Sequence, residues 1–295
     1  MRKAARVMPI IIVIAGIAGY YLRNKERLNV FDIDTGLPTP GAAETITLLV
    51  LVAAVLIVTF IFSLRTGLNY TSQDGFDHAY GVDILAYPVA SVLVGAVWLF
   101  GTIKVFFDMN AEGALSGGEY LYIALSALSA ISIALFAIGI YQDPRRRSLL
   151  MLSVVPALFM CLWLVLMYRQ NAANPILLEY SYKFLAATSA ALGFYYTSGF
   201  VHSKPAPGKT IFFYLNSVFF CMITLADDHG TGVKLILVSI VIISMIHASM
   251  LTKNLVKKEL VTKQSQDDFQ IDNLPDGIDD IPNRSGNLPD AEDDR

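Results

Sequence analysis

The chain has 295 residues, of which 55% are hydrophobic and only 16% are charged, and its mean hydropathy is +0.53. This composition excludes a soluble globular domain of ordinary residue usage and predicts an all-α, multi-pass membrane protein. The net charge of −3 hides two separate sets, because basic residues flank the apolar stretches whereas acidic residues gather toward the end of the chain.

Taken in chain order, the apolar stretches predict a polytopic transmembrane bundle of about eight helices, most of them near the length of about 20 residues that a bilayer crossing requires. The helices are expected at residues 7–22, 43–64, 83–107, 120–141, 149–168, 175–200, 210–226 and 233–251. Together they define a transmembrane domain of residues 1–252. Small residues recur at four-residue spacing, as at Ala15 and Gly19 and at Ser91 and Gly95, which indicates close helix packing.

The first apolar stretch is short and admits two interpretations. We favour an uncleaved helix, but the basic start and the small residues also fit a signal peptide of residues 1–18, cleaved before Gly19. Residues 23–43 are expected to be a connection, since Gly36, Pro38 and Pro40 are typical turn residues.

The lysines and arginines beside the helices predict the orientation. Most of them fall on the side that holds the N-terminus, so the positive-inside rule places both termini in the cytoplasm and the protein in the plasma membrane. Arg23, Lys25 and Arg27 are the contrary observation, because they fall on the opposite side.

The sixth predicted helix carries an acid and a base inside an apolar stretch. Asn174 and Pro175 suit the N-cap and first helical positions, which puts Glu179 about one turn inside and Lys183 about one turn deeper. The two share a face in the favourable order and are expected to point into the bundle.

Two interpretations of this pair remain open. Glu179 and Lys183 form a site for a substrate or a coupled ion, with Asn216 of the seventh helix as a further interior polar residue. Alternatively, Glu179 complements the positive end of its own helix and Lys183 pairs with it, as carboxylates at the starts of other helices suggest.

The turn before the last helix brings together three residue types that bind divalent cations. Asp227, Asp228 and His229 make this turn a candidate metal site, but adjacent residues seldom converge on one ion, and the nearby Gly230 and Gly232 favour a tight hairpin. His247, in the last helix, is interpreted as a packed histidine rather than a proton relay.

Beyond residue 252 the chain changes character twice. Lys253, Lys257 and Lys258 are expected to extend the last helix into a basic juxtamembrane segment, residues 253–263, suited to anionic lipid. Residues 264–295 are acidic and predicted to be disordered. Within them a repeated motif is a candidate docking site for a cytoplasmic partner; it comprises Asn273, Leu274, Pro275, Asp276, Asn287, Leu288, Pro289 and Asp290.

The common catalytic signatures are absent from the sequence. There is no phosphate-binding G-x-x-x-x-G-K-[ST] loop, no H-E-x-x-H and no G-x-S-x-G, and no connection is long enough for a soluble domain. The sequence therefore favours a protein without enzymatic activity but leaves that question open, since catalysis within the membrane would need none of these signatures. We expect no cofactor and no nucleic-acid partner.

The sequence resembles uncharacterised multi-pass bacterial membrane proteins. The resemblance depends on the stretch from Asn174 to Tyr182, on Phe194-Tyr195-Tyr196 and on Ala226-Asp227-Asp228. It implies a membrane bundle without an assigned activity, so it carries no functional residues over.

Two functional hypotheses follow. The first is a small-solute or ion transporter, or a permease-like component, that uses the polar residues of the bundle. The second is a membrane scaffold or sensor-type protein that recruits a cytoplasmic partner through its acidic tail.

Overall fold

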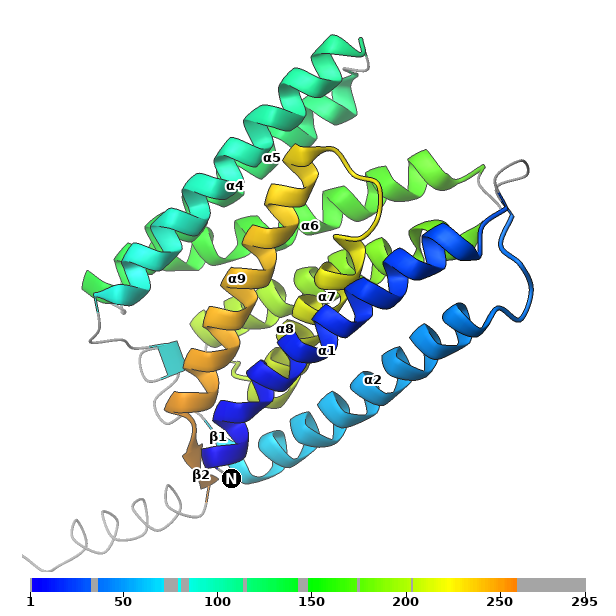
Figure 1. Ribbon diagram of the computed structural model, residues 1–295. Helices are drawn as coiled ribbons and strands as arrows, with labels where there is room; N and C mark the ends of the chain where they lie inside the picture. The colour runs from blue at the N-terminus through cyan, green and yellow to red at the C-terminus, as the bar shows by residue number, and fades with distance from the viewer. Residues whose placement is uncertain are drawn as a thin grey trace, which may run out of the picture. The chain divides into compact units, whose positions relative to one another are not determined.

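The computed structural model describes residues 2–32, 37–71, 79–80, 85–113, 116–142, 148–173, 176–202 and 204–258. This part of the chain is an all-α bundle, which confirms the predicted fold class, and it holds eight helices (Figure 1). They are α1 (Arg2–Asn29), α2 (Ala43–Asn69), α4 (Ala86–Ala111), α5 (Gly117–Gln142), α6 (Ser148–Asn171), α7 (Leu177–Val201), α8 (Pro207–Thr224) and α9 (Thr231–Asn254).

Six of the described helices are long and apolar enough to cross a membrane: α1, α2, α4, α5, α6 and α9. Their outward faces carry large exposed apolar side chains such as Ile14, Leu49 and Phe100, which need lipid around them. Helices α7 and α8 fall outside this set, and most of α8 is buried against neighbouring helices. The protein is therefore a multi-pass membrane protein.

Successive helices alternate in direction, so every second connection lies at the same end of the bundle. We call the end at which α1 and α8 finish and α7 and α9 begin the Arg23 end. At the opposite end, β1 (Tyr70–Thr71) pairs antiparallel with β2 (Val256–Lys257), close to the start of α1 (Figure 1).

Helices α8 and α9 each pack against four others: α8 against α1, α2, α7 and α9, and α9 against α1, α4, α7 and α8. Contacts also follow the chain from α4 through α5 and α6 to α7, and α1 packs against α2. Residues of α8 such as Ile211, Leu215 and Phe219 are fully buried, so the core of the bundle lies along this helix.

Glycines allow the closest helix contacts. A Cβ on Gly232 of α9 would lie 2.6 Å from the carbonyl oxygen of Gly101 in α4, and one on Gly95 would lie 2.8 Å from the carbonyl oxygen of Ala130 in α5. A Cβ on Gly19 of α1 would lie 2.7 Å from Ile223 of α8. The close packing predicted at Gly19 and Gly95 is confirmed.

Several helices are longer than the sequence indicated. Helix α1 continues through Arg23 and Arg27 to Asn29, so the expectation that the connection begins at residue 23 is wrong. The apolar stretch marked only the part of α1 suited to lipid, whereas a polar segment with no glycine or proline remains helical beyond it. Helix α9, by contrast, ends at Asn254 instead of extending through the basic segment, because the chain turns into β2.

Helix α8 is much shorter than α1, against which it packs. Its 18 residues correspond to about 27 Å, against about 42 Å for the 28 residues of α1. The α8–α9 turn, residues 225–230, consequently meets α1 at Arg23, before α1 has ended at Asn29.

Candidate binding site

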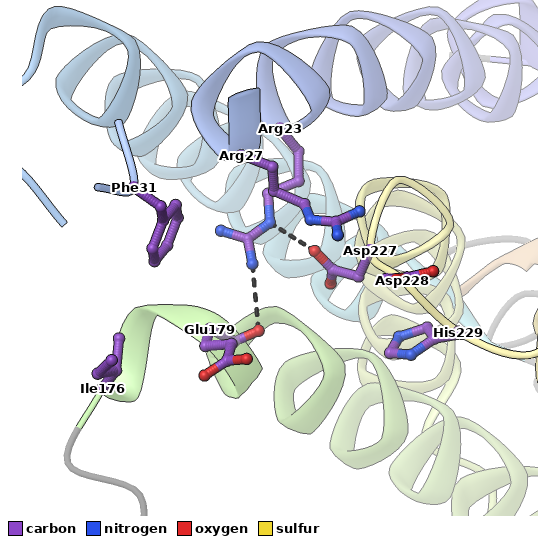
Figure 2. Close-up of a pocket in the computed structure, with 8 residues that line it drawn as sticks. All are labelled: Arg23, Arg27, Phe31, Ile176, Glu179, Asp227, Asp228 and His229. Atoms are coloured by element: carbon purple, nitrogen blue, oxygen red, sulfur yellow. Dashed lines mark hydrogen bonds and ion pairs between the residues drawn. The ribbon is translucent and has the colours of Figure 1, made fainter. Parts of the chain in front are cut away.

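A buried arginine joins three elements at the Arg23 end. Arg23 is only 1% exposed, and it donates from Nε to Asp227 Oδ1 at 2.7 Å and from Nη1 to Glu26 Oε2 at 2.8 Å. Its Nη2 donates to the main-chain oxygen of Glu179 at 3.1 Å (Figure 2). Such charge-assisted bonds are the strong ones in proteins, so Arg23 connects α1 to α7 and to the α8–α9 turn.

The sequence of α1 explains how Arg23 reaches this position. Gly16, Gly19, Arg23 and Glu26 are spaced by three and four residues, which places them on one face of the helix. The two glycines lie against Met222 and Ile223 of α8, so α1 approaches α8 closely just before the charged residues begin.

A second arginine lies one turn further along α1. Arg27 donates from Nη1 to the main-chain oxygen of Ala226 at 2.6 Å, next to Asp227. A cation is favourable there because the carbonyl groups at the end of a helix carry partial negative charge. This bond accounts for one of the five N–H donors of the guanidinium group.

Aromatic rings border the charged residues. The Arg23 guanidinium lies 5.0 Å from the centre of the Tyr182 ring, and the Lys183 ammonium lies 6.0 Å from that of Trp163 in α6. Both arrangements are within the range of cation–π attraction.

These elements enclose a cavity of about 370 Å³, which we call the polar cavity. It is lined by Arg23, Arg27, Phe31, Ile176, Glu179, Asp227, Asp228 and His229. Figure 2 shows Phe31 and Ile176 on one side of it and the α8–α9 turn on the other. Its size lies within the usual range of small-molecule sites.

Two buried atoms of lining residues have no hydrogen-bond partner in the described part of the chain: Asp227 Oδ2 and His229 Nε2. Burial raises the pKa of Asp227, and the Arg23 guanidinium acts in the opposite direction. Burial lowers the pKa of His229 to about 3, and the neighbouring cations Lys183, Lys234 and Arg27 act in the same sense. His229 is therefore a neutral imidazole at physiological pH.

The structure brings together residues that the sequence suggested separately. Glu179, expected to point into the bundle, has an exposed side chain at the polar cavity, which Asp227, Asp228 and His229 also line. Lys183 lies one turn deeper in α7. Asn216 stands apart, midway along α8, where it donates to Phe212 O at 2.8 Å and lies 3.3 Å from the Thr59 hydroxyl of α2.

The described residues contain no group of three or more His, Cys, Asp or Glu side chains that could hold a metal ion. At the candidate metal turn, Asp227 already pairs with Arg23 and the side chain of Asp228 is exposed. Adjacent positions in this turn are used for different contacts and do not converge on one point.

The basic segment and the tail are only partly described. Lys253 is exposed, Lys257 pairs through its backbone with Tyr70, and Lys258 Nζ donates to Gly67 O at 2.9 Å. The repeated motif at residues 273–276 and 287–290 lies outside the described residues.

A second buried polar cluster lies toward the opposite end of the bundle. His247 is 3% exposed, with Nδ1 at 2.9 Å from the Tyr214 hydroxyl and Nε2 at 3.4 Å from that of Tyr87. The Tyr214 hydroxyl is also 2.5 Å from Thr197 Oγ1. Both ring nitrogens have partners, as expected of a packed histidine.

Sequence reasoning did not identify Arg23, Glu26 and Arg27 as parts of a site. A signal was present, because Arg23 and Arg27 contradicted the charge bias of the other loops. Cations on the unfavoured side of a membrane protein indicate acidic partners nearby, and Asp227 is that partner.

Comparison with known proteins finds no match: no family model, no curated protein and no solved structure is similar to the chain. The geometry of the polar cavity is therefore the basis for a functional assignment.

Proposed function

We propose that the protein is a small-solute transporter or permease-like membrane protein whose solute-binding site is the polar cavity. One observation carries the proposal: a cavity of about 370 Å³ meets a buried carboxylate, Asp227, whose Oδ2 has no partner among the described residues. Because an unsatisfied buried carboxylate oxygen is costly, its retention beside a cavity favours a role in binding.

The helices around the cavity also support transport. Arg23 connects α1, α7 and the α8–α9 turn through side-chain bonds. A solute that changes those bonds changes how the three elements pack, which is the kind of coupling that alternating access requires.

The test is a flux measurement on the purified full-length protein in proteoliposomes. Solutes of the zwitterionic, cationic, anionic and neutral classes are applied in turn, and uptake or charge movement is compared with that of empty liposomes. We expect flux for at least one class, and at least a tenfold loss of that flux in Asp227→Asn.

The matched control is Asp108→Asn, which removes a carboxylate at the same end of the bundle but outside the cavity lining. Its flux should equal that of the wild type. The proposal fails if folded wild-type protein gives no flux above empty liposomes for every class, or if both variants lose flux equally.

A further inference from the structure

The polar cavity holds opposite charges very close together. Arg27 is bonded to the main-chain oxygen of Ala226, so its guanidinium lies within one residue of Asp227. Asp227 has one oxygen engaged by Arg23 and the other without a partner in the described part of the chain. A donor pole and an acceptor pole therefore adjoin each other on one side of the cavity.

Two arginines of the lining differ in what they still offer a ligand. Three nitrogens of Arg23 are committed, to Asp227, Glu26 and the Glu179 carbonyl, and the side chain is almost fully buried. Arg27 is only half-buried, and its Nη1 donates to the main-chain oxygen of Ala226 in the turn. Arg27 is consequently the residue suited to bind a carboxylate of a ligand.

The opposite side of the cavity is apolar. Phe31, just after α1, and Ile176, just before α7, lie across from the turn that carries Asp227 and His229 (Figure 2). A ligand that fits this arrangement has a charged end with both signs and an apolar end.

We infer that the polar cavity binds a small zwitterion of the α-amino-acid class with an apolar side chain. Its ammonium group faces Asp227 and the neutral His229, its carboxylate faces Arg27, and its side chain faces Phe31 and Ile176. An α-amino acid carries both charges on one carbon, which matches the adjacent poles. This inference rests on the proposed function for the role of the cavity, and it adds the chemical class of the solute.

The charges of the lining argue against simpler ligands. An anion would meet the carboxylates of Glu179, Asp227 and Asp228, and a cation would meet the guanidinium groups of Arg23 and Arg27. A zwitterion places each charge beside its opposite and leaves neither pole uncompensated.

The test uses three probes of nearly equal size on the full-length protein in nanodiscs: L-norleucine, pentylamine, which lacks the carboxylate, and hexanoate, which lacks the ammonium group. Binding is measured by calorimetry and by the shift in melting temperature. We expect norleucine to bind at least about tenfold more tightly than either of the other probes.

Two variants locate the poles. Arg27→Gln should reduce norleucine affinity to that of pentylamine, while the matched control Lys25→Gln, an exposed position on the same helix, leaves it unchanged. Because Asp227→Asn disturbs a buried ion pair and its folding is not assured, the comparison of the three probes on the wild type gives an answer without it.

The outcomes separate this inference from the proposed function. Equal affinity of the three probes, no binding of norleucine, or loss of binding in Lys25→Gln as large as in Arg27→Gln overturns the zwitterion site. Flux of another solute class with no norleucine binding overturns this inference alone. Norleucine binding without flux of any solute supports the site and overturns the transport proposal.

Discussion

At the scale of single residues, the most consequential feature is a charged side chain without access to water. Arg23 and Glu26 are 1% and 0% exposed, and Asp227 is 5% exposed. Taking such charges out of water is costly, and their mutual bonds offset the cost only while every partner is present. The cluster therefore fixes one arrangement of α1 against the α8–α9 turn.

Removing the arginine alone should be strongly destabilising. Arg23→Met leaves Asp227 and Glu26 buried without their cation, and we expect a loss of about 3–5 kcal/mol in the free energy of unfolding. The triple variant Arg23→Met, Glu26→Leu, Asp227→Leu should recover most of it. Reversible unfolding in mixed micelles measures both; a loss below about 1 kcal/mol in the single variant would contradict the account.

Acidification should destabilise the Arg23 end through His229. Its pKa is lowered from 6.5 to about 3, so the folded protein favours the neutral ring. The contribution of the neutral ring to the free energy of unfolding is fully present above pH 6.5 and is lost as the pH falls toward 3. By pH 5 the loss is at most about 2 kcal/mol.

Melting temperatures between pH 7.5 and pH 5 test this effect. His229→Gln should show a flatter decline than the wild type, whereas the control His202→Gln, an exposed histidine at the other end, should keep the wild-type slope. Parallel slopes for all three proteins would refute a contribution of His229.

At the scale of elements, the packing of α4 against α9 depends on two glycines facing each other. A Cβ on Gly232 would lie 2.6 Å from Gly101 O and 2.7 Å from the backbone nitrogen of Val105, and backbone atoms cannot rotate away as side-chain ends can. Moving α4 away from α9 to make room for a Cβ would leave unfilled space along the whole contact between the two helices.

We expect Gly232→Ala to lower stability by about 1–3 kcal/mol, the usual cost of overpacking. Gly117→Ala is the matched control, because nothing lies within 4 Å of a Cβ at that position and alanine favours the helix. Unfolding measurements that give Gly232→Ala the same stability as the control would show that α4 and α9 adjust freely.

The existence of the helices could be predicted from the sequence, but their ends could not. Apolar stretches mark all eight helices, although only six of these are long and apolar enough to cross a membrane and most of α8 is covered by its neighbours. Arg23, Glu26 and Arg27 continue α1 beyond its apolar part, and only the contact with Asp227 explains why charged residues remain inside the bundle there. That contact joins positions 204 residues apart, so local patterns contain no trace of it.

At the scale of the whole molecule, alternating helices put the two ends of the described chain on the same side. The lysine and arginine bias favours the cytoplasm for that side. In a background without Cys161 and Cys221, an impermeant maleimide should label Glu112→Cys in intact cells and Lys253→Cys only after the membrane is opened. Labelling of Lys253→Cys in intact cells would reverse the orientation.

Half of the candidate site could be anticipated from its residues. The sequence indicates four of the lining residues as ionisable groups in or beside apolar helices: Glu179, Asp227, Asp228 and His229. It predicts them as parts of two separate sites. Their meeting depends on α8 ending early and on α1 packing against it, which are properties of the assembled bundle. Arg27 stands out in the sequence only as a cation against the charge bias, because its role at the cavity comes from the carbonyl of Ala226 and not from any neighbour in sequence.

The shortness of α8 also bears on how the bundle fits a bilayer. With 18 residues, or about 27 Å, it is shorter than the hydrocarbon layer of about 30 Å. Protein groups, and not lipid, meet both ends of α8: Ser63 of α2 donates to Gly208 O at its start, and Arg23 of α1 donates to Asp227 just beyond its last residue. The neighbouring helices therefore absorb the mismatch between α8 and the hydrocarbon layer, and the surrounding lipid does not have to adapt to it.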